Sequence, residues 1–164
     1  MNKRMNKKAP EQELVELLAE KGFTITTVES CTGGMIAATI VNVPGASSVL
    51  NEAYITYSNE AKHRLVGVNE ETLNNYGAVS EKTAMEMVTG VAKKTDANCA
   101  IAVTGIAGPD GGTEEKPVGT VYAGFYCNGI TEVTRYNFSG DRTEIRSKTV
   151  VSVLEKMIKI IKNN

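Results

Sequence analysis

The stretch that decides the fold is Thr26-Thr27-Val28-Glu29-Ser30-Cys31-Thr32-Gly33-Gly34. Thr24 to Val28 is rich in β-branched residues, which is typical of a strand, whereas apolar residues recur at helical spacing over positions 35–41. The residues between them must form the turn from strand to helix. Such a turn is where α/β enzymes usually place their chemistry, and this one carries two side chains that can act as nucleophiles, Ser30 and Cys31.

Composition indicates one domain with no overall affinity for nucleic acid. The chain has 164 residues, 41% of them hydrophobic, which is enough for one buried core and too few for two ordinary domains. Lys and Arg total 18 against 19 Asp and Glu, so the formal net charge is −1 and does not favour binding to nucleic acid. We expect one domain over residues 10–164, preceded by a disordered basic tail at residues 1–9.

The N-terminus lacks the apolar core of a secretory signal, and no stretch approaches the length of a membrane span, so we expect a cytoplasmic protein that binds no membrane. The three cysteines, Cys31, Cys99 and Cys127, form no CxxC pair, which argues against a disulfide framework and a zinc site. Cys99 lies in an apolar run and is expected to be a small buried hydrophobe. The single histidine, His63, excludes a metal site built from several histidines.

Helices are predicted over residues 10–21, from 35 onward, and over 59–66, 70–76, 81–94 and 142–162. Strands are predicted at Thr24–Val28, Glu52–Tyr57, Cys99–Thr104, Val118–Tyr126 and Ile130–Phe138. The last two strands flank Asn128-Gly129, a strong hairpin signal. Strands that alternate with helices, plus one hairpin, predict an α/β fold: a mixed, mostly parallel sheet covered by helices on both faces.

Five further segments follow the Ser30 turn in a fixed order: Tyr54–Lys62, Gly77–Ser80, Thr104–Gly112, Glu115–Val121 and Phe138–Arg142. Together with that turn, they resemble the CinA C-terminal family, whose enzymatic members are nicotinamide-nucleotide amidases. The resemblance runs from about Glu11 to the end of the chain, and ordered blocks are stronger evidence than a lone glycine motif. It implies a three-layer α/β/α sandwich. It also implies an amidase domain over residues 10–164 that hydrolyses nicotinamide mononucleotide to nicotinic acid mononucleotide and ammonia, with no metal or cofactor.

Ser30 is the candidate nucleophile and needs a base within hydrogen-bond reach. His63 lies outside the family-like blocks, and a lone histidine on a polar helix is more often solvated. Lys62 ends such a block and is the preferred base, provided that its amine is desolvated or lies near a cation such as Arg142. Tyr57 either relays or orients the proton through its hydroxyl, or it is a strand tyrosine half buried in the core.

Cys31 is the rival nucleophile, because a helix N-terminus lowers the pKa of a thiol. Successive side chains at a strand end point in opposite directions, so only one of Ser30 and Cys31 is expected to face the cleft. We favour Ser30, with Cys31 packed under the sheet. Glu29 either orients Lys62 or caps the helix, and the sequence leaves both roles open.

Ligand contacts are predicted at three places. Thr32, Gly33 and Gly34 offer N–H groups, and Thr32 also a hydroxyl, to an oxyanion. Thr104 is expected to point its hydroxyl into the cleft, and the glycines that begin at Gly105 either bring the backbone close to a ligand or form plain turns. Asp141 and Glu144 have capping-box spacing, which puts Arg142 in the first turn of the last helix. There it binds a phosphate or forms a surface ion pair, and the resemblance of this block to the family favours the phosphate.

Two functions remain in competition. The first is the amidase, with a small nucleotide as its substrate. The second is a binding or adaptor module, because CinA proteins are also linked with competence and DNA-damage responses and often carry an additional N-terminal domain. No such domain is recognisable here, which favours a stand-alone amidase. A P-loop hydrolase is disfavoured because neither glycine loop has the GxxxxGK[ST] spacing. We also expect a homo-oligomer, of a size that the sequence does not specify.

Overall fold

The computed structural model describes residues 8–164. Its helices are α1 (Pro10–Lys21), α2 (Met35–Val41), α3 (Asn59–Val66), α4 (Glu70–Tyr76), α5 (Glu81–Thr95) and α6 (Arg142–Lys162), with a short 3₁₀ helix η1 (Ala46–Ser48). Its strands are β1 (Ile25–Glu29), β2 (Leu50–Ile55), β3 (Cys99–Gly105), β4 (Thr120–Cys127) and β5 (Ile130–Asn137). Most of the predicted basic tail at residues 1–9 lies outside the described residues.

The five strands form one sheet in the order β2-β1-β3-β4-β5. β1 pairs in parallel with both β2 and β3, whereas β4 is antiparallel to β3 and to β5. β4 therefore runs in the direction opposite to the other four strands, which confirms the prediction of a mixed, mostly parallel sheet with one hairpin. β1 has a neighbour on each side and is buried along its whole length, so the segment that follows Glu29 starts from the middle of the sheet.

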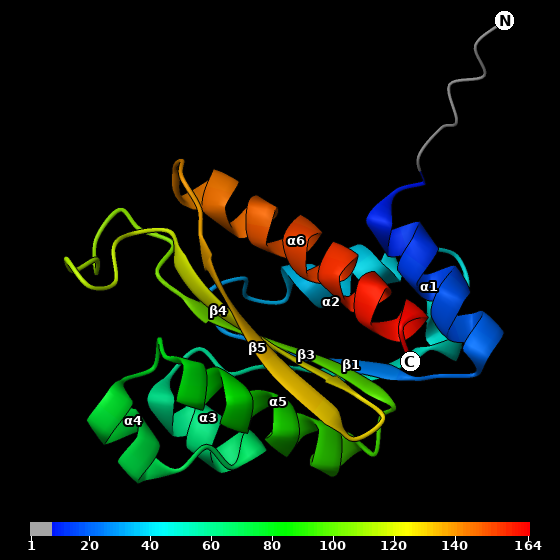
Figure 1. Ribbon diagram of the computed structural model, residues 1–164, viewed down its shortest axis with the longest axis horizontal. Coiled ribbons are helices and arrows are strands. Elements are labelled where there is room, and N and C mark those ends of the chain that lie inside the picture. The colour runs from blue at the N-terminus through cyan, green and yellow to red at the C-terminus, as the bar shows by residue number, and fades with distance from the viewer. Residues whose placement is uncertain (1–7) are drawn as a thin grey trace, which may run out of the picture.

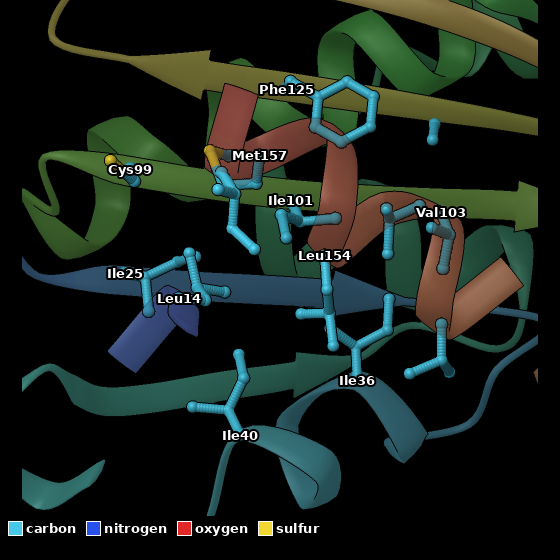
Figure 2. Close-up of a cluster of buried hydrophobic side chains, with 14 of the residues drawn as sticks. Leu14, Ile25, Ile36, Ile40, Cys99, Ile101, Val103, Phe125, Leu154 and Met157 are labelled. Atoms are coloured by element: carbon cyan, nitrogen blue, oxygen red, sulfur yellow. The ribbon is translucent and has the colours of Figure 1, made fainter. Parts of the chain in front are cut away.

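Helices cover both faces of the sheet, as Figure 1 shows: α1, α2 and α6 lie on one face and α3, α4 and α5 on the other. Alternate residues of β3 point to the two faces, with Ile101 and Val103 in one core cluster and Ala102 in the other. In the larger cluster, side chains from α1, α2 and α6 meet those of β1, β3 and β4 (Figure 2). The three-layer α/β/α sandwich is confirmed.

Most of the predicted element ends are confirmed by local chemistry. Asn128 and Gly129 have φ values of 46° and 93°, as a two-residue hairpin turn requires. The Ser80 hydroxyl accepts a hydrogen bond from the N–H of Thr83 at 3.2 Å and so caps α5. β2 differs from the prediction, because it ends at Ile55 and the chain then leaves the sheet. Tyr57 is 62% exposed, so the alternative of a half-buried strand tyrosine is wrong.

Gly90 permits the close approach of α3 to α5. A Cβ atom added at Gly90 would lie 1.8 Å from the carbonyl oxygen of Val66, so a larger residue must push α3 away. We expect Gly90→Ala to lower the free energy of unfolding by roughly 1–3 kcal/mol, the usual cost of overpacking, whereas Thr89→Ala at the exposed neighbouring position changes it little. Denaturant unfolding of both variants measures the difference, and equal midpoints would contradict this account of the α3–α5 contact.

Candidate active site

A small polar cavity of about 220 Å³ lies at the carboxyl ends of β1 and β3, between the segments that follow them and the beginnings of α3 and α6. Its lining consists of Ser30, Cys31, Tyr57, Lys62, Ala78, Val79, Thr104, Gly105, Ala107 and Arg142. The structure thus brings together six of the predicted site residues: Ser30, Tyr57, Lys62, Thr104, Gly105 and Arg142. Carboxyl ends of strands are where open α/β sheets bind ligands.

Lys62 and Ser30 form the centre of this site. The Lys62 amine lies 3.1 Å from the Ser30 hydroxyl, 2.9 Å from the carbonyl oxygen of Thr56 and 3.4 Å from that of Tyr57. Only 1% of Lys62 and 8% of Ser30 are exposed. Lys62 reaches the cavity from the first turn of α3, whose start the Ser58 hydroxyl fixes by accepting a hydrogen bond from the N–H of Ala61.

The three contacts of Lys62 are all to oxygen atoms that accept hydrogen bonds, those of Ser30, Thr56 and Tyr57. Once the amine is neutral, its two N–H groups can stay on the two carbonyl oxygens, and its lone pair is then available to the Ser30 hydroxyl. Burial lowers the pKa of Lys62 below its ordinary value, because desolvation disfavours the charged ammonium. Of the two causes that the sequence left open, desolvation is the one found here. Arg142 is not among the groups that shift this pKa.

Glu29 caps the helix that follows the turn. Its fully buried carboxylate accepts hydrogen bonds from the Thr32 hydroxyl at 2.5 Å and from the backbone N–H groups of Gly34, Ile36 and Ala37 at 3.0, 3.1 and 2.9 Å. Glu29 therefore satisfies the donors at the start of α2. Of the two roles left open for this residue, the structure favours the cap.

The same bonds correct the prediction that Thr32, Gly33 and Gly34 hold an oxyanion. The N–H of Gly33 donates to the carbonyl oxygen of Ser30 at 3.1 Å, and that of Gly34 donates to Glu29. Thr32 is fully buried and its hydroxyl also donates to Glu29. None of the three borders the cavity, because the turn uses their polar groups to close on itself.

Cys31 borders the cavity beside Ser30, but only 7% of it is exposed, in agreement with the expectation that Cys31 packs under the sheet. Its chemistry also disfavours it as the nucleophile. Burial raises the pKa of the Cys31 thiol to about 11, whereas a reactive cysteine needs a lowered pKa. Cys31 also packs in the core cluster under α2 and α6. His63 is exposed, shares a hydrogen bond of 2.7 Å with the carbonyl oxygen of Val68 and lies outside the cavity lining.

Thr104 and Gly105 form the wall contributed by β3. The Thr104 hydroxyl donates to the carbonyl oxygen of Ala78 at 2.7 Å, so it ties two walls of the cavity together. A Cβ atom at Gly105 would lie 2.7 Å from Cγ2 of Val121. Gly105 therefore makes room for β4, and because it also borders the cavity, its contact with a ligand stays a prediction.

Arg142 lies at one side of the cavity together with Tyr57. The guanidinium donates to the carbonyl oxygen of Gly108 at 2.7 Å and to the Tyr57 hydroxyl at 3.1 Å. The capping box of Asp141 and Glu144 is present, which confirms the predicted position of Arg142 in the first turn of α6. The Tyr57 hydroxyl contacts Arg142, and Tyr57 contacts Lys62 through its backbone carbonyl. This arrangement suits an orienting role for Tyr57 better than a proton relay.

Sequence reasoning missed Arg146. Its guanidinium donates to the carbonyl oxygens of Cys31 at 3.0 Å and Thr32 at 3.1 Å, so α6 contacts the Ser30 turn directly. The sequence did contain one signal for this residue: Arg146 follows Arg142 by four positions and therefore lies on the same side of the helix. Ala78 and Val79 also border the cavity, although the sequence gave no reason to assign them a role.

Comparisons with known proteins all indicate one family. A family model described as the CinA C-terminal domain matches residues 7–161. The chain is 52% identical over 145 residues to a putative competence-damage inducible protein of Clostridium perfringens, covering 88% of this chain and 35% of that protein. The chain thus spans about a third of the length of the curated relatives it matches.

Solved structures agree over almost their full length. A competence/damage inducible protein from Agrobacterium tumefaciens is 40% identical with a TM-score of 0.87, covering 93% of this chain and 96% of that one. A CinA superfamily protein from Klebsiella pneumoniae is 32% identical with a TM-score of 0.91, covering 94% and 97%. Over the described residues, none of the helices combines the length and apolar character needed to cross a bilayer.

Proposed function

Because the chain belongs to the CinA C-terminal domain family, we propose that it is an amidohydrolase that converts nicotinamide mononucleotide to nicotinic acid mononucleotide and ammonia. The observation that carries this proposal is the buried Lys62 amine, 3.1 Å from the Ser30 hydroxyl and with its pKa lowered by burial. A serine beside a desolvated lysine is an activated nucleophile. The nature of the substrate rests on the family resemblance.

The geometry supports a two-step reaction. The Ser30 oxygen attacks the carboxamide carbon while Lys62 takes the hydroxyl proton. The tetrahedral intermediate then collapses, the C–N bond breaks, and the Lys62 ammonium returns the proton to the departing ammonia. Neutral Lys62 next takes a proton from a water molecule that attacks the ester. The proton returns to Ser30 as the acid leaves.

Arg142 and Tyr57 are suited to hold the phosphate of the nucleotide. Both border the cavity and are exposed, so they meet the part of the substrate that extends out of a cavity of about 220 Å³. A guanidinium binds phosphate through charge-assisted hydrogen bonds. Binding energy from this remote group then aligns the carboxamide with Ser30.

Arg142→Ala is expected to reduce kcat/KM for the mononucleotide by roughly 10- to 150-fold, the equivalent of one charge-assisted hydrogen bond of about 1.5–3 kcal/mol. Nicotinamide riboside lacks the phosphate, so the wild type should have a lower kcat/KM for it than for the mononucleotide. Arg142→Ala should reduce kcat/KM for the riboside only slightly further. Steady-state kinetics with both substrates measures the difference. Arg64→Ala removes an exposed arginine that pairs with Glu60 and serves as the control. Equal losses on both substrates would mean that Arg142 does not hold the phosphate.

Ammonia release from nicotinamide mononucleotide tests the proposal as a whole. The competing proposal is a non-catalytic nucleotide-binding or adaptor module in a competence or DNA-damage response, in keeping with the names of the relatives. That module would bind the mononucleotide without releasing ammonia. Calorimetric binding without turnover would therefore favour the adaptor and contradict the amidase.

A further inference from the structure

Arg146 acts on the carbonyl groups of the turn that carries Ser30. Its two hydrogen bonds, to the carbonyl oxygens of Cys31 and Thr32, are the contacts that α6 makes at this turn through a charged side chain. Arg146 is partly buried, and it does not border the cavity. We therefore expect its influence on the reaction to pass through the backbone of the turn and through its charge, without a contact to the reacting atoms.

A continuous chain of peptide groups leads from Arg146 to the cavity. In a trans peptide the C=O and N–H bonds point in opposite directions. Arg146 donates to the carbonyl of Thr32, and the N–H on the other side of that peptide, from Gly33, donates to the carbonyl of Ser30 at 3.1 Å. The N–H on the far side of the Ser30 carbonyl belongs to Cys31. Each hydrogen bond in such a chain polarises the next.

The chain ends where an oxyanion donor is needed. Cys31 borders the cavity and directly follows the nucleophile, a position whose N–H often stabilises the tetrahedral intermediate in serine hydrolases. Within residues 8–164, the N–H of Cys31 donates to no carbonyl or side-chain oxygen and interacts with the thiol of the same residue. The neighbouring N–H of Ser30 is not available, because it donates to the carbonyl of Val103 at 3.1 Å.

Charge at the turn gives Arg146 a second effect. The buried carboxylate of Glu29 lies at the same turn, and its negative charge opposes the development of an oxyanion on the substrate. The Arg146 guanidinium places a positive charge on the carbonyl side of the turn and offsets it. The electrostatic influence of both groups reaches Cys31, where Glu29 raises and Arg146 lowers the pKa of the thiol.

We propose that Arg146 is a positioning residue that orients and polarises the Cys31 N–H, which donates to the oxyanion when Ser30 attacks. The proposal rests on the proposed amidase chemistry and adds the group that stabilises its transition state. It replaces the oxyanion donors that the sequence suggested at Thr32, Gly33 and Gly34. Since the donor acts only when negative charge develops, Arg146 should affect kcat and leave substrate binding unchanged.

Steady-state kinetics of Arg146→Gln on nicotinamide mononucleotide is the first test. Loss of an oxyanion donor lowers kcat by about 10²–10³-fold, so loss of its positioning group should lower kcat by roughly 10- to 100-fold. KM and the inhibition constant of nicotinic acid mononucleotide should stay within about threefold of the wild type, since neither reports the transition state. Arg146→Lys, which keeps the cation but not the two-pronged contact, should give an intermediate kcat.

Arg135→Gln is the matched control. Arg135 also donates to a backbone carbonyl, that of Glu115 at 2.9 Å, and lies away from the Ser30 turn, so its loss should leave kcat unchanged. Unfolding midpoints of all variants show whether they fold. If Arg146→Gln does not fold, the comparison of Arg146→Lys with Arg135→Lys carries the test. Proportional changes in KM and kcat, or a wild-type kcat in Arg146→Gln and Arg146→Lys, would overturn the proposal.

A fluorophosphonate probe separates this inference from the identity of the substrate. Ser30 attacks the phosphorus, a P–O bond forms as the P–F bond breaks, fluoride leaves, and the serine proton passes to Lys62. The rate of Ser30 labelling, followed by intact mass, should fall in Arg146→Gln but not in Arg135→Gln. If the wild type is labelled and releases no ammonia from the mononucleotide, the proposed function fails while the role of Arg146 is still measured. Equal labelling rates in the two variants would contradict that role.

Discussion

Ser30→Ala is expected to lose nearly all amidase activity, by about 10⁴-fold or more, while the fold survives. The substitution removes the attacking oxygen. The side-chain hydrogen bond that it breaks is the one to Lys62 at 3.1 Å, and the turn stays closed by Glu29 and Arg146. Ammonia release and the thermal unfolding midpoint, measured on the same preparation, test both parts of the expectation.

Cys31→Ala provides the internal control, because Cys31 is the neighbouring residue and also borders the cavity. With its pKa raised to about 11 by burial, the thiol contributes little thiolate at neutral pH, and the variant should keep most of its activity. It should lose some stability, since Cys31 packs in the core. An inactive Cys31→Ala together with an active Ser30→Ala would reverse the assignment of the nucleophile.

Lys62→Arg is expected to abolish turnover, because a guanidinium cannot give up its proton and therefore cannot act as a base. In the wild type, kcat/KM should rise with pH through an apparent pKa below the ordinary lysine value of about 10.4, since burial lowers the pKa of Lys62. The pH profile of kcat/KM for the wild type and the variant checks both points. Turnover in Lys62→Arg at the wild-type rate would exclude Lys62 as the base.

Because the Lys62 amine is buried, the free energy of unfolding should also depend on pH. Between the lowered pKa of folded Lys62 and the unfolded value of about 10.4, the unfolded chain binds more protons, so the Lys62 contribution to stability rises with pH across this window. Lys62→Met removes this contribution. In denaturant unfolding at several pH values, the free energy of unfolding of the wild type, measured relative to that of Lys62→Met, should therefore rise with pH. A pH-independent difference would indicate that Lys62 is not desolvated in solution.

Local signals predicted the helices and strands well, because their ends depend on neighbouring residues. Ser80 and Asp141 cap α5 and α6 through their own side chains, and Asn128-Gly129 closes the hairpin by its backbone preference. The predicted β2 was shifted toward the C-terminus because the end of this strand depends on a partner. The N–H of Thr56 bonds the carbonyl of Glu29, and the chain then turns away, although Tyr57 has high strand propensity.

The candidate site was predictable in its members but not in the direction of their polar groups. Strand order puts Ser30, Lys62 and Thr104 at one edge of the sheet, as the sequence indicated. The N–H groups of Gly33 and Gly34 are not free for a ligand. That of Gly34 donates to Glu29, and that of Gly33 donates to the carbonyl oxygen of Ser30 within the turn. The contact of Arg146 with Cys31 spans 115 positions of the chain, so the spacing from Arg142 places Arg146 on the right side of α6 but does not identify its partner.

The direction of α6 makes this domain easy to use as a module. Its 21 residues rise about 1.5 Å each, so the last of them, Lys162, lies about 30 Å along the helix from Arg142 and the cavity. α1 lies beside that far end, where Lys162 pairs with Glu13 at 2.6 Å (Figure 1). Polypeptide that continues from Lys162 therefore begins on the side remote from the cavity. Partners joined there do not reshape the cavity, so this domain is compatible with many protein architectures.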